Sequence, residues 1–522
     1  MSTDAIFDTE WDVIIIGAGM GGGTAAYQLT KHQKNVLLIE KGYSSFKRFE
    51  GVEFELEDPK ERLESGKWPT KLTTTVNGRK SDIWAPLGCG LGGSTLLYAA
   101  ALQRLKPFDF DEQSLPNGQT IRWPFSYSEL EPYYQQAEAQ FSVCGTPDPL
   151  DTQSNYQLKS PPPMCAADQH LFQQFQAAGF NPHRLHVAID YDAPCQECGG
   201  HICPKSCKKD ANNACVEPAL SSGYLTILDN TEVIRINAGK TAVSSVQVRH
   251  EGQEKELKAK QFVLSAGAYF TPVVLQRSAS DDWPQGLANE SGLVGKNLMF
   301  HASDFIAIWP KEKHSREGYS KTIAVRDFYD QPDKKWGELQ STGLTAGYGN
   351  VLYALRLLFD QSVFKKIPLL RHVLRIPAYI ASKVLGEATV FTTIVEDFPY
   401  LENQVFIDEN TPSGMQVEYT IHEEFRQRVR AMTKTVRQRL SKLRSYPMSL
   451  KVSLNYGHPC GTCRAGDDPA TSVLDRNCKA HGIDNFYIVD SSFMPTSGGT
   501  NPSLTIAANA LRVADHIAKQ LD

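Results

Sequence analysis

The sequence lacks the defining features of several protein classes. It has no run of about 18 or more mostly apolar residues, which a membrane-spanning helix requires. Residues 1–11 are polar and acidic, without the basic start and short apolar core of a secretory signal, so we expect a cytoplasmic protein. Positive charge is not in excess either, because 54 Lys and Arg stand against 59 Asp and Glu. Since affinity for phosphate backbones depends on clustered positive charge, the net charge of −5 predicts no nucleic-acid partner.

The length and composition are those of a large globular protein. The chain has 522 residues, of which 41% are hydrophobic and 22% charged, and this excludes disordered, fibrous and small disulfide-rich proteins. At about 100–200 residues per domain, the chain should form two to four domains, or one large α/β unit with an appended one.

The N-terminus carries a dinucleotide-binding pattern. A β-branched run at 12–16 predicts a buried strand, residues 24–31 a helix and residues 35–39 a second strand that ends at Glu40. Between the first strand and the helix lies the motif G-x-G-x-x-G, formed by Gly17, Gly19 and Gly22. In this motif the glycines permit a tight turn, close approach of a pyrophosphate and helix–strand packing, and the distal acid binds ribose. The motif alone does not separate FAD from NAD.

The last 70 residues hold a second set of signals. Residues 486–489 predict a strand that ends at Asp490, and a glycine-containing loop follows it. Pro502 suits the first turn of a helix, and Asn501 is placed to cap it. Apolar residues then recur at helical spacing and predict one buried face, formed by Ile506, Ala510, Leu511, Val513, Ala514 and Ile517.

With these motifs the chain resembles the glucose–methanol–choline (GMC) oxidoreductases, flavoenzymes that oxidise alcohols. The resemblance covers nearly the whole chain and is closest to the cholesterol-oxidase-like and bacterial FAD-dependent sugar and alcohol dehydrogenase branches. Besides the N-terminal motif, it rests on GCGLGGST at 88–95, WP at 123–124, LEPYY at 130–134, VLSAGA at 263–268, GLVGKNL at 292–298, ENQV at 402–405, HPCGT at 458–462 and NP at 501–502.

The resemblance implies a catalytic pair. His458 matches the histidine that acts as general base, and Asn501 matches its partner about 40 residues later. A base must accept the hydroxyl proton while a hydride leaves the same carbon for the flavin, and the pKa of histidine suits that role. A donor amide beside it can hold the developing alkoxide.

The resemblance also implies where FAD is bound. The implied contacts are Gly17, Gly19, Gly22 and Glu40 for the ADP half, Val233 for adenine, Ala266 and Gly267 near the pyrophosphate, Gly92, Gly93, Ser94 and Leu97 along the flavin, and Asp490, Ser491, Asn501 and Pro502 for the ribityl chain and pyrimidine. Some family members attach FAD covalently through a histidine in the segment that corresponds to residues 88–95 here. This sequence has no histidine between Gly51 and Gln169, so we expect non-covalent FAD.

Five of the 11 cysteines fall within residues 195–215. Three interpretations stay open for this cysteine-rich segment: thiolate ligands of an iron–sulfur cluster, one or two disulfides or a redox pair, and plain loop thiols. The segment resembles the cysteine-rich insert of FAD-dependent glucose dehydrogenases that carry such a cluster. The ligands would be Cys195, Cys198, Cys203 and Cys207.

Residues 351–391 combine many apolar residues with six basic and two acidic ones, so this stretch is positive within an acidic chain. Pro368 and Pro377 should divide it into short helices. Basic amphipathic helices lie on membrane surfaces or cover apolar substrates, whereas ordinary core-facing helices and a site for a partner subunit are the alternatives.

The resemblance therefore predicts an α/β fold, with a Rossmann-like FAD-binding domain (1–110, 215–300 and 450–522) and an α+β substrate domain (111–214 and 301–449) of antiparallel sheet with helices on one side. We expect oxidation of an alcohol to an aldehyde or ketone, with a lipophilic alcohol favoured, and with oxygen, a quinone or a redox partner as electron acceptor. The alternatives are a flavin-dependent lyase, a fatty-acid photodecarboxylase, an electron-transfer or assembly subunit without turnover of its own, and a sugar dehydrogenase that passes electrons through an iron–sulfur cluster.

Overall fold

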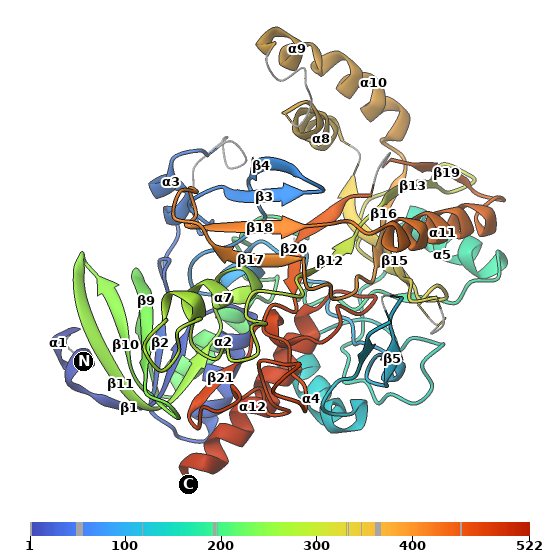
Figure 1. Cartoon of the computed structure of the whole chain (residues 1–522). Coiled ribbons are helices and arrows are strands. Elements are labelled where there is room, and N and C mark those ends of the chain that lie inside the picture. Colours follow the sequence, from blue (N-terminus) through green and yellow to red (C-terminus); the bar gives the residue numbers. More distant parts are fainter. Residues whose placement is uncertain are drawn as a thin grey trace.

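The computed structural model describes residues 3–47, 56–116, 118–191, 195, 197–329, 331, 334–345, 347–360, 367–448 and 452–522. It has the predicted mixed α/β fold, in which the strands form several sheets and helices pack against them (Figure 1). Outside the two main sheets and the helices named below, the shorter elements are α1 (Thr3–Asp8), α3 (Pro59–Glu64), α6 (Glu217–Ser221), β5 (Gln113–Ser114), β6 (Thr120–Ile121), η2 (Pro107–Asp109) and η3 (Asn212–Val216).

A seven-stranded sheet contains the strands that flank the N-terminal glycine motif. Its strands are β1 (Glu10–Ile16), β2 (Val36–Ile39), β8 (Leu225–Leu228), β9 (Thr231–Ala238), β10 (Val243–His250), β11 (Gln253–Leu264) and β21 (Phe486–Ile488). The order β8-β2-β1-β11-β21 is parallel, and β9 and β10 extend it antiparallel from the first half of β11. The apolar runs predicted as strands at 12–16 and 35–39 are thus confirmed within a residue or two at each end.

Parallel pairing brings distant segments to one edge of this sheet. Ile16 pairs with Leu264, and Leu264 pairs with Ile488, so the residues that follow these three strands emerge side by side. Ligands of open α/β sheets bind at the carboxyl ends of the strands. The two ends of the chain therefore meet at one site.

Helices α2 (Met20–Lys31), α12 (Ser503–Leu521) and α4 (Tyr127–Gln140) pack beside this sheet, with α12 against both of the others (Figure 1). The predicted apolar face of α12 is confirmed, because all six of its named residues are buried. Helix α2 begins four residues earlier than predicted, directly after Gly19.

An eight-stranded antiparallel sheet forms the second part. Its strands are β7 (Pro182–Arg184), β12 (Met299–Ala302), β13 (Phe305–Trp309), β14 (Ile323–Val325), β15 (Gly337–Thr345), β16 (Thr389–Val395), β19 (Arg444–Pro447) and β20 (Leu454–Cys460). Helices α5 (Ala166–Ala177) and α11 (Glu423–Arg439) share one apolar core with it. A four-stranded sheet lies next to α7 (Gly267–Arg277) and contains β17 (Gln404–Ile407), β18 (Met415–Tyr419), β3 (Leu72–Val76) and β4 (Arg79–Ile83).

Three helices stand out from the body at the top of Figure 1: α8 (Tyr348–Asp360), α9 (Pro368–Val373) and α10 (Arg375–Leu385). We call this segment the hairpin; its residues 361–366 lie outside the described part. Pro368 begins α9 as predicted, whereas Pro377 lies inside the first turn of α10 and the helix boundary falls at Leu374. Among the described residues, no helix has the length and apolarity needed to cross a bilayer.

Candidate active site

The first glycine loop, residues 17–22, joins β1 to α2. Gly17 has a φ of +98°, and a Cβ there would lie 2.3 Å from the carbonyl oxygen of Ser265. A Cβ on Gly22 would lie 1.9 Å from the carbonyl oxygen of Gly17. No side chain tolerates these distances, so glycine is required at both positions and the helix packs closely on the strand.

The second glycine loop, residues 88–97, lies against the first. The N–H of Gly92 donates to the carbonyl of Ala18 at 3.0 Å, and a Cβ on Gly93 would lie 2.7 Å from the Cα of Gly19. A Cβ on Gly19 would meet only the Cα of Gly93, at 4.0 Å. The free N–H groups at the start of α2 border this open space, so it fits the pyrophosphate of FAD.

The rest of the second loop is held by the cysteine-rich segment. Ser94 lies in the short helix η1 (Gly93–Leu96), where its hydroxyl accepts the N–H of Gly88 at 3.3 Å. The carbonyl of Leu97 accepts the N–H of Gly200 at 3.0 Å. The buried ammonium of Lys208 donates to four carbonyls from both segments, those of Leu96, Tyr98, Cys198 and His201.

Glu40 is buried at the end of β2 and ties the two glycine loops together. Its carboxylate accepts the N–H groups of Ala18 (2.9 Å), Gly42 (2.9 Å) and Gly90 (3.0 Å). Burial raises the pKa of Glu40 more than these N–H groups lower it. A carboxylate has about four acceptor positions. Oε1 of Glu40 accepts from Gly42 and Gly90 and faces the thiol of Cys89 at 3.9 Å, whereas Oε2 accepts from Ala18. The position that fits a ribose hydroxyl is therefore on Oε2.

The residue expected at adenine, Val233, lies in β9. This strand starts beside Glu40, because the N–H of Thr231 donates to the Glu40 carbonyl at 2.9 Å. Val233 is buried in this strand, which runs from Thr231 to Ala238.

Asp490 joins the C-terminal strand to the start of α7. Its carboxylate accepts the N–H of Gly267 at 3.0 Å and the hydroxyl of Thr271. Its other oxygen accepts the N–H of Ser492 at 2.9 Å and caps the short helix η5 (Ser491–Phe493). Ala266 precedes α7, and a Cβ on Gly267 would meet nothing within 4 Å. This open corner fits a cofactor that passes between the two chain ends.

His458 lies in an irregular part of β20. Four residues of β20, 456–459, face the single residue Phe300 of β12. Such bulges redirect side chains and are common beside active sites. The hydroxyl of Ser491 donates to the carbonyl of Pro459 at 2.7 Å, which holds this stretch against η5.

The ring of His458 meets a second histidine, His301 of β12. Their Nδ1 atoms lie 3.0 Å apart and the ring planes cross at 89°. Nε2 of His301 faces the carbonyls of Gly498 (2.9 Å) and Ser497 (3.2 Å). Sequence reasoning missed His301, although it follows the motif at 292–298 by only three residues.

These contacts fix the protons on both rings. Burial lowers the pKa of His301 to about 4, so this ring is neutral and carries one proton. Carbonyl oxygens only accept hydrogen bonds, so the proton of His301 is on its Nε2. Nδ1 of His301 must then accept a hydrogen bond from Nδ1–H of His458. His458 is half-buried, and its pKa is lowered well below the usual value by burial and by His301. Its Nε2 is therefore left without a proton, as a base requires.

Asn501 does not cap α12, which corrects the sequence prediction. The helix starts at Ser503, Pro502 occupies the cap position, and no side chain caps it. Instead the amide of Asn501 donates to Glu338 (3.3 Å) and Gln340 (3.1 Å), two residues on one face of β15. Both amide hydrogens are used, so the amide oxygen is the group left to bind a substrate hydroxyl, unless a substrate oxygen displaces one of these acceptors.

Glu338 connects Asn501 to a buried polar layer that the sequence did not reveal. Burial raises the pKa of Glu338 to about 7, and the nearby Arg326 acts in the opposite direction. Its second oxygen accepts from the amide of Gln103 and lies 3.6 Å from the guanidinium of Arg326. A carboxyl group with a pKa near neutrality next to a candidate site is typical of functional positions.

Opposite charges continue in pairs behind Glu338. Asp148 lies 2.7 Å from the ammonium of Lys106 and 3.7 Å from Arg326. Arg104 forms a two-bond pair with Glu138, at 2.7 and 2.6 Å, and all of these side chains are buried or nearly so. Buried charges are tolerated when they are paired in this way.

The cysteine-rich segment does not support the iron–sulfur prediction. The thiol of Cys203 interacts with those of Cys198 and Cys207, and Cys207 also interacts with Cys195. However, within the described residues no group of three or more His, Cys, Asp or Glu is arranged to hold a metal ion. All eleven cysteines belong to the described part, and each is a free thiol.

We predict that Cys203 is the most reactive of these thiols. Burial disfavours its thiolate, but backbone N–H groups of Lys208, Lys205 and Cys207 outweigh that effect and lower its pKa. Burial raises the pKa of Cys195 to about 11 instead. Iodoacetamide at neutral pH should therefore label Cys203 first, as measured by peptide mass spectrometry over time. Earlier labelling of Cys195 would contradict this.

Comparison with known proteins agrees with this geometry. Family models described as GMC oxidoreductase match residues 11–303 and 399–510. Paromamine 6'-oxidase of Streptomyces fradiae is 30% identical, over 98% of this chain and 92% of its own. The fructose dehydrogenase large subunit of Gluconobacter japonicus is 25% identical over 98% of both chains.

Solved structures share the fold. Pyridoxine 4-oxidase from Mesorbium loti superposes with a TM-score of 0.65 at 19% identity, over 97% of this chain and 99% of its own. A fungal aryl-alcohol oxidase superposes with a TM-score of 0.63 at 16% identity, over 98% and 99%. The matched family models, the relatives and the two glycine loops lead to one conclusion: this chain belongs to the GMC oxidoreductase family and is an FAD-dependent alcohol oxidoreductase.

Proposed function

We propose that this protein oxidises the hydroxyl-bearing carbon of a small polar alcohol to an aldehyde or ketone, with His458 as the base. FAD held between the two glycine loops would supply the hydride acceptor. The observation that carries this proposal is the chain of hydrogen bonds from Gly498 through His301 to His458. It holds the proton of His458 on Nδ1 and presents a bare Nε2 to the substrate hydroxyl.

A polar substrate suits the groups around Asn501. Glu338 and Gln340 hold its amide, and an oxygen-rich substrate can exchange hydrogen bonds with all three. The sequence favoured a lipophilic alcohol because of residues 351–391, but most of the described apolar side chains of α9 and α10 are exposed on the hairpin. Two relatives are named for paromamine and fructose, which supports a hydroxyl-rich substrate.

Anaerobic mixing of the FAD-loaded protein with a panel of alcohols tests this function. We expect sugar and amino-sugar alcohols to bleach the flavin absorbance, and aliphatic long-chain alcohols to do so poorly. Adding oxygen, or a quinone analogue without oxygen, then identifies the electron acceptor. Absence of bleaching by every alcohol would exclude alcohol oxidation and favour a lyase or a light-driven decarboxylase.

We also predict the pH dependence of the chemical step. A base acts only when unprotonated, and the pKa of His458 lies well below the usual 6.5 because of burial and the neighbouring His301. As the pH falls, His458 becomes protonated, and so inactive as a base, only when the pH passes this lowered pKa. The rate of flavin reduction at saturating alcohol should therefore stay constant down to about pH 6.5 and decline only below it. Stopped-flow measurement across the pH range would contradict this if the rate halved at a higher pH.

A further inference from the structure

The hairpin is attached to the body through a narrow base. Val351 of α8 and Ala378 of α10 pack with Val390 of β16, and Phe305 of β13 borders this small cluster. Beyond it α9 and α10 extend away from both main sheets (Figure 1). The outer surface of the hairpin is thus not used to build the core.

That outer surface is apolar. Leu369 is 73% exposed and Ile376 is 64% exposed, and Tyr379, Ile380 and Val384 are each more than half exposed. Along α10 the positions 376, 380 and 384 are four residues apart and share one face of the helix. Exposed apolar patches of this kind mark interaction surfaces on water-soluble domains.

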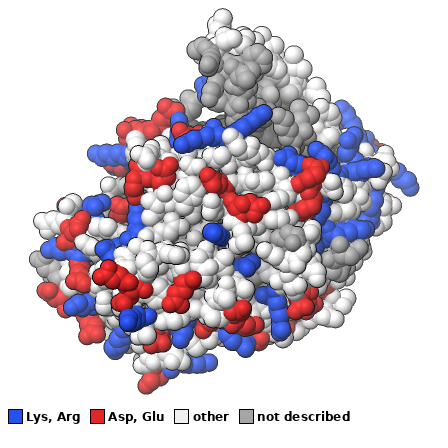
Figure 2. All heavy atoms as spheres, viewed as in Figure 1, with Lys and Arg blue, Asp and Glu red and all other residues white. Residues whose placement is uncertain are grey.

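The charges on α9 and α10, the outer helices of the hairpin, have one sign. No Asp or Glu occurs between Asp360 and Glu387, whereas Arg371, Arg375 and Lys383 lie on α9 and α10. The body, by contrast, shows acidic and basic residues side by side (Figure 2). This basic and apolar surface complements an anionic one.

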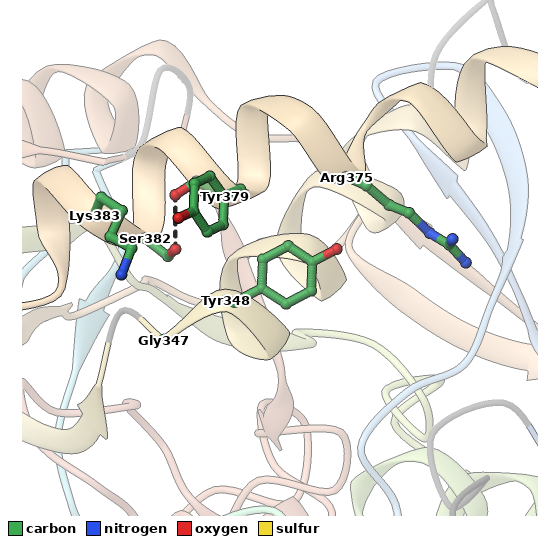
Figure 3. Close-up of a pocket in the computed structure, with 6 residues that line it drawn as sticks. All are labelled: Gly347, Tyr348, Arg375, Tyr379, Ser382 and Lys383. Atoms are coloured by element: carbon green, nitrogen blue, oxygen red, sulfur yellow. Dashed lines mark hydrogen bonds between the residues drawn. The ribbon is translucent and has the colours of Figure 1, made fainter.

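A hollow of about 530 Å³ opens between α8 and α10. It is lined by Gly347, Tyr348, Arg375, Tyr379, Ser382 and Lys383, and Tyr348 of α8 faces the side chains of α10 (Figure 3). The hydroxyl of Ser382 donates to the carbonyl of Tyr379 at 2.8 Å, so its lone pairs remain available. Among the described residues, no carboxylate pairs with Arg375 or Lys383. Two unpaired cations beside hydroxyl groups fit a phosphate.

We propose that the hairpin docks this protein on an anionic phospholipid bilayer, with its apolar side chains among the acyl chains and a headgroup phosphate in the hollow. Such binding needs no membrane-spanning helix. The charge pattern argues against a second copy, because a symmetric contact would bring the same cations together. The inference concerns where the enzyme works and is independent of its substrate.

Co-sedimentation with vesicles tests the proposal on the FAD-loaded full chain. We expect binding to phosphatidylcholine vesicles that contain phosphatidylglycerol, and little binding to phosphatidylcholine alone. Ile376→Asp with Ile380→Asp should abolish binding. Arg375→Gln with Lys383→Gln should weaken it about 30-fold, because each basic residue near an anionic surface contributes about fivefold.

Leu401→Asp is the matched control, because Leu401 is 43% exposed on the body and should have no effect. Flavin absorbance and alcohol oxidation, measured on each variant in solution, show that the fold is intact. The proposal is overturned if the unmodified protein stays in the supernatant with anionic vesicles, or if the hairpin variants bind as well as Leu401→Asp. Light scattering that shows a dimer lost in the Ile376→Asp, Ile380→Asp variant would assign the surface to self-association instead.

Discussion

His458→Ala should lower the rate of flavin reduction by alcohol about 10²- to 10⁴-fold while FAD stays bound. The size of the loss follows from the role of the base, since the substrate hydroxyl would have to give its proton to water while the hydride leaves. No FAD contact is predicted for the His458 side chain, so cofactor content should not change. Single-turnover reduction under anaerobic conditions measures the chemical step directly.

Two further variants separate catalysis from folding. His481→Ala removes another half-buried histidine, whose ring bonds to the hydroxyl of Ser472 at 2.9 Å, and should leave reduction unchanged. His301→Leu keeps the base but removes the acceptor that orients it, so the loss should be smaller and the acid limb of the pH profile should move. A His458→Ala protein that reduces flavin within tenfold of the original rate would show that another group accepts the proton.

The parts of the site that local sequence dictates were predictable. The first glycine loop is one example, because a strand, three glycines and a helix are contiguous in the chain. The clash that excludes a side chain at Gly22 is local, with the carbonyl of Gly17, whereas the one at Gly17 involves Ser265 of a distant segment. The buried face of α12 followed for the same reason, since helical spacing is a local property.

The parts that depend on distant pairing were not predictable. His301 is 157 residues from His458, and only the pairing of β12 with the irregular stretch of β20 brings them together. Asn501 was expected to cap a helix, but Glu338 and Gln340 of β15 offer it two acceptors instead. Tertiary hydrogen bonds thus prevailed over a local capping preference.

Composition alone also left the two unusual segments undecided. The cysteine-rich segment has thiols in mutual contact, but the group that joins it to the second glycine loop is Lys208, which donates to the carbonyls of Leu96 and Tyr98 as well as to two carbonyls of its own segment. The basic apolar stretch 351–391 could have been core or surface by its sequence. Its exposure depends on how few residues of the body reach it, and no periodicity encodes that.

Glu138→Leu should lower the free energy of unfolding by about 3–5 kcal/mol. Glu138 and Arg104 are both completely buried and joined by two short bonds. Removing the carboxylate leaves the buried guanidinium with the hydroxyl of Tyr127, the carbonyl of Asn155 and the more distant carboxylate of Glu131, 3.8 Å away. The partly exposed Glu131 does not replace the short two-bond pair. The midpoint of urea unfolding, followed by tryptophan fluorescence, measures the loss.

Replacing both members of the pair, by Arg104→Met with Glu138→Leu, should restore most of that stability. The double variant buries apolar side chains in place of two charges, and such replacements are often neutral or stabilising. The double variant removes the acceptor of the Gln157 N–H, but Gln157 is exposed, so water can bond to it, and the carbonyl of Asn155 still accepts from the amide of Gln135 at 3.0 Å. If the double variant is as unstable as Glu138→Leu alone, then the loss comes from packing or from the backbone around residue 104, and the buried charge is not its cause.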